Sequence, residues 1–322
     1  MKKQMSPDQP RVSIGLPVYN GERFLRETLD SILAQTFEEF ELIISDNAST
    51  DKTAEICQEY LAKDQRVRYF RNSENLGAAR NYNRTFELAT GQYFKWAAGD
   101  DLLAPEYLER CVAVLDRAPS VVLCYTAETR IDASGKPLRK SILDRLNLRS
   151  PTPAQRFQQH HRLWYQRSFM STNPIFGLIR VRALQKTPLI GNYVWSELAL
   201  LMELMLLGEF YEVPEHLFFF RWHPKTSRAT RESAGWEELA IWFDPKNKGK
   251  IVLPEWGLLF QQLASIQRVP MSFSEKVFCY LQVGKWFSWK WKKLAKELMM
   301  ATGKLITKAY LISSQKLSIK KI

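Results

Sequence analysis

Two adjacent carboxylates, Asp100 and Asp101, directly follow the largely apolar stretch FKWAAG at residues 94–99. A carboxylate pair can hold a divalent cation, because Mg²⁺ and Mn²⁺ take oxygen ligands and often share them with substrate phosphates. The same pair can also do no more than open a helix, since Asp favours helix starts and Pro105 suits a first helical turn. On these residues alone, both interpretations stay open.

The chain lacks the glycine-rich loops that commonly hold phosphates. It contains neither GxxxxGK[ST] nor GxGxxG, the patterns of P-loop and Rossmann dinucleotide-binding proteins. Neither class is therefore expected. A phosphate-bearing ligand would instead be held by a metal ion and by side chains on loops at one edge of a sheet.

Composition favours a globular protein with reduced thiols. With 322 residues, 45% of them hydrophobic, the chain can build one large or two modest domains. Its four cysteines form no CxxC pair, and its four histidines lack zinc-ligand spacing. No apolar stretch follows the N-terminal lysines and no later one could span a bilayer, so we expect a cytoplasmic protein without signal peptide or anchor.

The net charge of +12 is concentrated in the tail, where residues 271–322 carry 11 Lys and 2 Glu. This composition predicts a basic amphipathic helix that lies on an anionic membrane surface. A helix packed on the rest of the protein with solvated lysines is the alternative, and nucleic acid is not expected because no binding motif is present. The predicted apolar face is Leu294, Leu298, Ala301 and Leu305, beside Lys292, Lys293, Lys296 and Lys304 and near Trp286, Trp289 and Trp291.

Hydrophobic periodicity predicts alternating strands and helices in the first half of the chain. Such alternation indicates a parallel α/β sheet with right-handed crossovers, whose ligands bind at the carboxyl ends of the strands. Those ends carry Pro17–Tyr19, Asp46–Asn47 and Gly99–Asp101. The predicted strands are residues 12–16, 40–44, 67–70, 93–97 and 121–125, and the helices between them include 52–62, 78–89 and 105–116.

The pattern is looser after residue 150, where one strong helix is predicted at 196–207. The segment WFDPKNKGK at 242–250 indicates loop. We therefore predict three parts: a catalytic domain at 1–230, a loop-rich linker at 231–270, and a basic amphipathic helical tail at 271–322.

Four ordered segments resemble the inverting family 2 glycosyltransferases with a GT-A fold. They are VSIGLPVYNGERFLRETLDSILAQTFEEFELIISDNASTD, NLGAARNYN, GQYFKWAAGDD and WSELALLMELMLLGEFYEVPEHLFFFRWH, and together they span about residues 10–228. The ordered set is far more specific than any one segment. The resemblance implies a GT-A type, mostly parallel sheet flanked by helices, to which the tail adds a basic helical extension.

The resemblance implies a nucleotide site at the first two strand ends. Pro17, Val18 and Tyr19 match the loop that packs on the base and ribose. Asp46 matches the carboxylate that contacts the base edge in users of uridine nucleotides, and Asn47 shares that role. A turn-forming role is the alternative for Asp46.

A second donor segment follows the third predicted strand. Asn75, Gly77, Arg80 and Asn81 match the family segment that approaches the donor. Arg80 suits a phosphate because its guanidinium is always charged and can bind in bidentate fashion, although it can also be an ordinary surface arginine. More weakly, Asn173, Phe176 and Gly177 match positions on the acceptor side.

The acidic pair matches the family's metal motif, usually written DxD. The resemblance makes Asp101 the direct ligand of Mn²⁺ or Mg²⁺ and turns Asp100 toward the donor sugar or ribose. Arg221 and His223 match a late R-x-H element in which the histidine lies near the metal or diphosphate. With Lys225, they would stabilise the charge of the leaving group.

Glu197 matches the position of the catalytic base. Inversion requires a carboxylate that removes the proton of the acceptor hydroxyl while its oxygen attacks the anomeric carbon. Many members have two adjacent acids there, whereas this chain has Ser196-Glu197-Leu198. The alternative is a helix N-terminal charge stabilised by the helix dipole.

The resemblance implies transfer of one sugar from a nucleotide-diphosphate sugar, a uridine one, to a hydroxyl of a cell-surface glycan precursor at the cytoplasmic face of a membrane. Processive synthesis is not expected because a QxxRW element is absent. Two alternatives are a sugar-phosphate nucleotidyltransferase, which would release pyrophosphate, and a non-catalytic module that binds sugar nucleotides or membranes.

Overall fold

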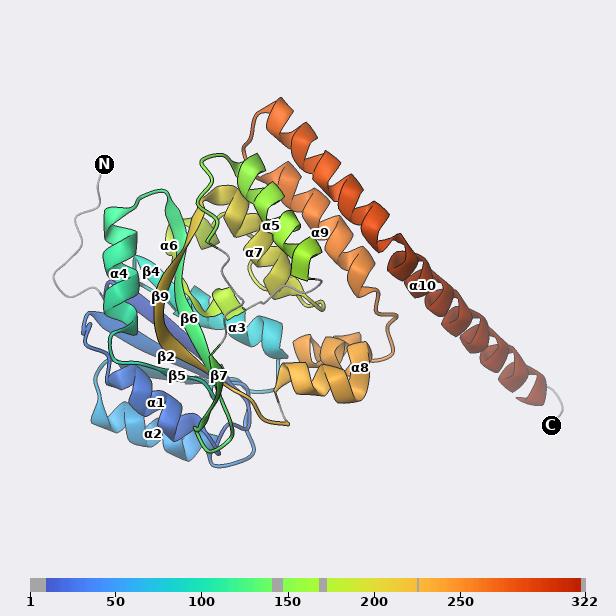
Figure 1. The fold of residues 1–322 in the computed structure, drawn as a ribbon. Helices are drawn as coiled ribbons and strands as arrows, with labels where there is room; N and C mark the ends of the chain where they lie inside the picture. The colour runs from blue at the N-terminus through green and yellow to red at the C-terminus, as the bar shows by residue number, and fades with distance from the viewer. Residues whose placement is uncertain (1–9, 141–146, 168–172, 225, 320–322) are drawn as a thin grey trace.

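The computed structural model describes residues 10–140, 147–167, 173–224 and 226–319. A single nine-stranded sheet forms the centre of this part of the chain, and helices cover both of its faces (Figure 1). The long C-terminal helix runs along the outside of the helical layer. No helix in the described part combines the length and the apolar character needed to cross a bilayer.

The first half of the chain builds the parallel part of the sheet, in the order β3-β2-β1-β4. Every position of β1 and β2 is buried, because helices cover parallel strands on both faces. The predicted alternation is confirmed here to within a few residues. The elements are β1 (Val12–Val18), α1 (Leu25–Leu33), β2 (Phe40–Asp46), α2 (Thr53–Lys63), β3 (Val67–Arg71), α3 (Ala78–Glu87) and β4 (Tyr93–Trp96).

The sheet continues beyond β4 in the order β8-β6-β9-β5, and β7 pairs with β6. Strand β8 is antiparallel to both of its neighbours. Antiparallel β5 and β9 pair Leu102 with Phe219, which brings the end of β9 beside the acidic pair. The elements are β5 (Leu102–Leu103), α4 (Tyr107–Arg117), β6 (Val121–Ile131), β7 (Pro137–Lys140), β8 (Leu178–Arg180) and β9 (Glu209–Arg221).

Helices predominate in the rest of the described chain. Two of them occupy the segment 231–270, so the expectation of a loop-rich linker there differs from the structure. Only the centre of that segment is irregular, and the apolar side chains Leu258, Leu259 and Ile266 of α9 pack into the core. These elements are α5 (Pro153–Arg167), η1 (Asn173–Phe176), α6 (Val181–Leu184), α7 (Ser196–Leu207), α8 (Ser227–Phe243), η2 (Pro245–Asn247), α9 (Pro254–Arg268) and α10 (Phe273–Ile319).

The sheet separates two apolar clusters. Alternate residues of β4 enter different clusters: Phe94 and Trp96 pack with α5, α7 and α9, whereas Tyr93 and Ala97 pack with α1, α2 and α4. This period of two is what a strand covered on both faces requires. The ends of the strands are thereby held rigidly, with the loops that carry the predicted site at one edge.

Candidate active site

The predicted nucleotide loop lies at the carboxyl ends of β1 and β2. Asn47 N donates to Val18 O at 2.8 Å, which joins the two strand ends. Pro17 and Val18 are buried strand residues, whereas Tyr19 is 49% exposed. Of these three predicted residues, Tyr19 therefore offers the accessible ring on which a base can stack.

Asp46 is completely buried and fastens the turn that follows β2. Its Oδ1 accepts a hydrogen bond from Ser49 N at 2.9 Å, and its Oδ2 accepts one from the Tyr69 hydroxyl at 2.8 Å. Arg71 Nε lies 3.8 Å from the same Oδ2. These contacts fit the turn-forming alternative, and contact with a base edge stays a prediction for Asp46.

Asn47 connects the first nucleotide loop to the second donor segment. Its Nδ2 donates to Asn75 Oδ1 at 2.8 Å, and its Oδ1 accepts from Asn72 Nδ2 and Leu76 N, both at 2.9 Å. Each polar atom of this buried amide is thus used to hold a loop. The structure brings together two segments whose shared role the sequence predicted.

Gly77 is held in a backbone conformation that suits glycine. Its φ is +82°, and a Cβ built there would lie 2.6 Å from Phe243 O. The donor segment therefore rests against the end of α8. Arg80 lies exposed in the first turn of α3, while Asn81 is buried and donates to Ser45 O at 2.8 Å.

The acidic pair and the R-x-H element meet at the end of β9. Asp101 Oδ1 accepts a hydrogen bond from Arg221 N at 2.9 Å, and Asp100 Oδ2 lies 2.8 Å from His223 Nε2. Burial, together with the charge of Asp100, raises the pKa of Asp101 well above its usual range. Asp101 and His223 are buried and Asp100 is partly exposed, so Asp100 is the more accessible carboxylate of the pair.

Arg221 braces the acidic pair from behind. It is fully buried, and its guanidinium donates to Asp100 O at 2.8 Å and to Glu27 Oε2 at 2.7 Å. The guanidinium also lies 4.7 Å from the centre of the Phe24 ring. These contacts position the loop, whereas the sequence predicted a diphosphate contact. Lys225 lies outside the described residues.

The residues present fit a divalent cation that also binds its substrate. No cluster of three or more His, Cys, Asp or Glu suited to a metal occurs in the described ranges. Asp100 and His223 nevertheless offer a carboxylate and an imidazole 2.8 Å apart. Mg²⁺ and Mn²⁺ commonly use few protein ligands and complete their shell with phosphate oxygens and water.

Glu197 occupies the first turn of α7. Its Oε2 is enclosed and has no hydrogen-bond partner among the described residues. Burial raises the pKa of Glu197 to about 7. A carboxylate that is half protonated near neutral pH is suited to removing a proton, because the best general bases have a pKa near the working pH.

Tyr82 is a residue of this region that sequence reasoning missed. Burial and then the charges of Asp100, Glu197 and Asp101 raise the pKa of Tyr82. Its position next to Asn81 in the matched donor segment was the available signal. Glu27, which binds Arg221, carried no such signal because its helix shows only ordinary amphipathic spacing.

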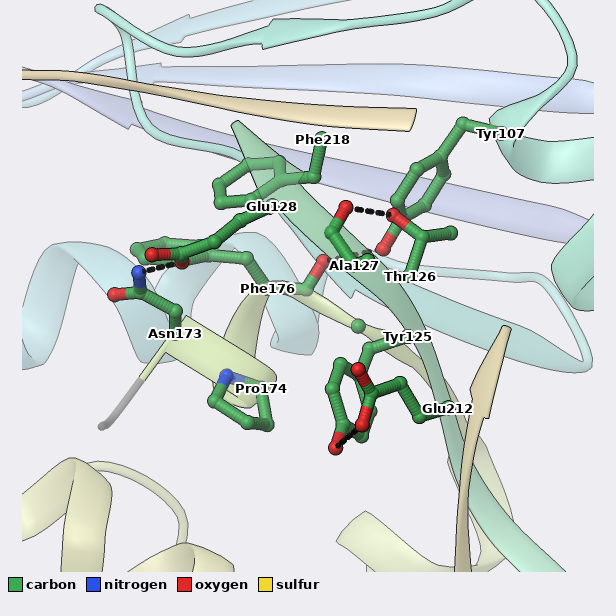
Figure 2. Close-up of a pocket in the computed structure, with 11 residues that line it drawn as sticks. Tyr107, Tyr125, Thr126, Ala127, Glu128, Asn173, Pro174, Phe176, Glu212 and Phe218 are labelled. Carbon is green, nitrogen blue, oxygen red and sulfur yellow. Dashed lines mark hydrogen bonds between the residues drawn. The ribbon is translucent and has the colours of Figure 1, made fainter. Parts of the chain in front are cut away.

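The weaker acceptor-side residues Asn173, Phe176 and Gly177 line a small pocket together with residues of β6 and β9 (Figure 2). Asn173 donates to the Glu128 carboxylate, and Phe176 O accepts hydrogen bonds from Tyr107 and Lys95. Burial lowers the pKa of Lys95 to about 7. With room for about one water molecule, this pocket supports the neighbouring loops and is too small for a sugar.

Comparison with known proteins identifies the family. The family described as Glycosyl transferase family 2 matches residues 13–186. The chain belongs to this family. That match confirms the family, and the sheet with its flanking helices confirms the expected GT-A type of fold. Glu197, Arg221, His223 and Lys225 lie beyond the matched residues, and the roles of the site residues stay predictions.

Several curated relatives match part of this glycosyltransferase family member. The putative glycosyltransferase EpsE of Bacillus subtilis is 40% identical over 34% of this chain and 39% of its own length. The uncharacterized glycosyltransferase MJ1057 of Methanocaldococcus jannaschii is 32% identical over 41% of this chain and 47% of its own. The chain thus spans less than half the length of these relatives.

Solved structures share the fold over most of the chain. Residues 1–349 of TarS from S. aureus, in complex with UDP, superimpose with a TM-score of 0.53 at 20% identity, covering 81% of each chain. The mannosyltransferase PcManGT from Pyrobaculum calidifontis, in complex with GDP-Man and Mn²⁺, gives a TM-score of 0.52 at 16% identity, covering 92% of this chain and 87% of its own. At these identities the likeness concerns the fold alone.

Proposed function

We propose that this family 2 member is a metal-dependent, inverting glycosyltransferase that moves one sugar from a nucleotide-diphosphate sugar to a hydroxyl group. The carrying observation is Glu197, whose enclosed Oε2 has no partner among the described residues and whose pKa is raised to about 7. The charges of this carboxylate and of Asp100 both raise the pKa of Tyr82. A base beside a metal-binding pair is the arrangement that single displacement requires.

The proposed reaction assigns one task to each of these groups. Glu197 Oε2 accepts the proton of the acceptor hydroxyl while that oxygen forms a bond to the anomeric carbon. The bond from that carbon to the diphosphate oxygen breaks on the opposite face, and its electron pair leaves with the nucleoside diphosphate. Attack and departure on opposite faces invert the configuration.

Asp100 and His223 would hold Mn²⁺ or Mg²⁺, which neutralises the charge of the diphosphate when bound. Asp101 and Arg221 keep that pair in place through the hydrogen bonds at the end of β9. Arg80 is exposed in the first turn of α3 and would supply a further cation for the phosphates. His223 and Lys225 would stabilise the negative charge of the departing nucleoside diphosphate.

The proposed donor carries uridine, and the proposed acceptor is a cell-surface glycan precursor at the cytoplasmic face of a membrane. The accessible ring of Tyr19 supports stacking on a base. TarS, which shares the fold, binds UDP and UDP-GlcNAc, whereas PcManGT binds GDP-Man. Proteins of one fold thus differ in the base, so the uridine assignment rests on the resemblance at Asp46.

The test combines calorimetric titration with product analysis. We expect UDP to bind the purified protein in the presence of Mn²⁺, binding to weaken in Asp100→Asn, and Glu197→Gln to retain it while losing sugar transfer. Absence of nucleotide binding in all conditions would overturn the donor site. Release of pyrophosphate would identify a nucleotidyltransferase, and binding without any turnover would identify a non-catalytic module.

A further inference from the structure

The apolar residues of α10 lie on two faces of the helix. One face is buried against α5 and α9 and includes Cys279, Val283 and Trp286. The face predicted from the sequence is divided by this packing, because Leu294 is 1% exposed whereas Leu298 is 46% exposed. The single face predicted from the sequence is therefore split, with Leu294 and Ala301 buried and Leu298 and Leu305 exposed.

A second row of apolar side chains lies on the outside of α10, and we call it the outer stripe. At about 100° per residue, its members fall within a sector about 100° wide, whose centre lies about 150° from that of the buried face. Such a row is unusual on a helix whose other face is already packed. Its members are Phe273, Val277, Leu281, Trp291, Leu298, Met299 and Ile306, each between 40% and 83% exposed. Of the other exposed apolar side chains of α10, Phe287 and Leu305 lie beside the stripe, and Trp289 and Met300 lie outside it.

The charges of α10 are arranged in a matching way. Lys285, Lys292 and Lys296 are exposed and follow one edge of the outer stripe. The two acidic residues of the tail, Glu275 and Glu297, lie on the opposite side of the helix, where Glu297 accepts hydrogen bonds from the N-terminus of α9. The outer stripe therefore has a positive border with no carboxylate along it.

We propose that the outer stripe docks this protein on the surface of an anionic lipid bilayer. Apolar side chains would enter the interface, and the lysine border would meet the lipid headgroups. A second copy of the chain suits the stripe less well, because its lysine border would face like charges. Figure 1 shows that the helical layer lies on one side of α10 and that the C-terminal half of α10 extends beyond the globular part.

Docking through α10 is independent of the proposed reaction, because none of the residues assigned to that reaction lies on α10. Docking would nevertheless hold the active site at the surface where lipid-linked acceptors are found. The surface, unlike the donor site, can be tested without a sugar nucleotide.

The experiment measures sedimentation of the full chain with vesicles of phosphatidylcholine alone or mixed equally with phosphatidylglycerol. We expect the unmodified chain to bind the mixed vesicles only. Two triple variants should each reduce this binding roughly tenfold or more. One is Leu281→Ser/Trp291→Ser/Met299→Ser, and the other is Lys285→Glu/Lys292→Glu/Lys296→Glu. The matched control is Lys52→Glu/Lys63→Glu/Lys186→Glu, three exposed lysines on the globular part with the same charge change. This control should bind the mixed vesicles far better than the lysine variant of α10.

Equal binding to uncharged vesicles, absence of binding to either kind, or equal loss in the control would each overturn the proposal. So would a dimer, detected by analytical ultracentrifugation without lipid, that the Ser variant dissociates. Circular dichroism and thermal unfolding of each variant check the fold. All substituted side chains are exposed, so we expect unchanged transitions.

Discussion

At the scale of single residues, Glu197 differs from the other acidic residues of the site in its contacts. Asp46 accepts two hydrogen bonds, Asp101 accepts one from Arg221 N, and Asp100 lies against His223. Within the described chain, Oε2 of Glu197 has no such partner. A carboxylate held in this way is poorly stabilised as an anion, which is why its affinity for a proton is raised.

Replacement of that carboxylate tests its role. We expect Glu197→Gln to lower kcat by about 10²–10⁴-fold with little effect on nucleotide affinity, because only proton removal is lost. In the unmodified protein the rate should rise with pH through about 7, where the base loses its proton. The measurement is a pH–rate profile of sugar transfer. A variant with unchanged kcat would show that Glu197 is only a helix-terminal charge.

Gly77 supports a second residue-scale prediction, this time on stability. Gly77→Ala should lower the free energy of unfolding by about 1–3 kcal/mol, because φ is +82° and the new Cβ would meet Phe243 O. It should also weaken nucleotide binding through the displaced donor segment. Gly257→Ala is the matched control: it lies inside α9 with no atom within 4 Å of the added Cβ. That substitution should stabilise by up to about 1 kcal/mol.

Urea unfolding of both variants gives the comparison. An equal effect of the two substitutions would mean that the donor segment is free to move away from the end of α8. That outcome would remove the argument that this contact holds the segment in place.

At the scale of elements, a buried ion pair joins α7, which carries Glu197, to α9. Glu203 is almost fully buried and accepts hydrogen bonds from Arg268 Nε at 3.0 Å and from Ser265 Oγ at 2.9 Å. Because α7 is otherwise apolar from Leu198 to Leu207, this carboxylate is the polar group through which the middle of α7 contacts α9. The position of Glu197 thus depends on a helix from the segment that the sequence predicted to be a linker.

Arg268→Met should lower the free energy of unfolding by about 1–3 kcal/mol, since the buried carboxylate loses its charged partner. Because Arg268 is partly exposed, the loss of unfolding free energy should lie at the lower end of the range found when buried ion pairs are broken. Arg268→Met combined with Glu203→Met should be less destabilising than the sum of the two single variants. Additive effects in this double-mutant cycle, measured by urea unfolding, would mean that the pair is not coupled.

At the scale of the whole molecule, the parts of the site that local sequence could predict are those set by strand ends. The alternation of strands and helices placed Tyr19, Asn47 and Asp100 at one edge of the sheet, and the structure confirms that edge. Contacts between distant segments could not be predicted in this way. Whether Trp286 is buried while Trp291 is exposed depends on which side of α10 meets α5 and α9, and a single helix with two apolar faces does not specify it.

The three-helix layer of α5, α9 and α10 also makes the stability of the molecule depend on pH. His160 and His161 of α5 are buried there, and burial lowers the pKa of both rings. The nitrogens of His160 have no partner among the described residues, while His161 lies 2.9 Å from both Phe157 O and Gln262 Oε1. Burial therefore disfavours the charged form of both rings, and it outweighs the two oxygen acceptors beside His161, which favour that form.

This arrangement predicts loss of stability in mild acid. Above about pH 6.5, the usual histidine pKa, both rings are neutral in the folded and unfolded chain, so the full stability is present. As the pH falls below that value the unfolded chain binds protons that the folded chain does not, and the free energy of unfolding should fall by up to about 1.4 kcal/mol per pH unit for each ring. Urea unfolding between about pH 7.5 and about pH 5 measures this slope.

His160→Phe should reduce the slope, because it removes one of the two titrating rings and keeps an aromatic side chain in contact with Trp164. Glu197 and Asp101, whose pKa values are raised, bind protons more readily in the folded chain over the same range and so oppose this slope; the difference between His160→Phe and the unmodified chain therefore measures the histidine contribution. A slope that is the same in His160→Phe and in the unmodified chain would show that the α5 histidines do not control the acid response. The helical layer that presents α10 outward would then owe its acid sensitivity to other groups.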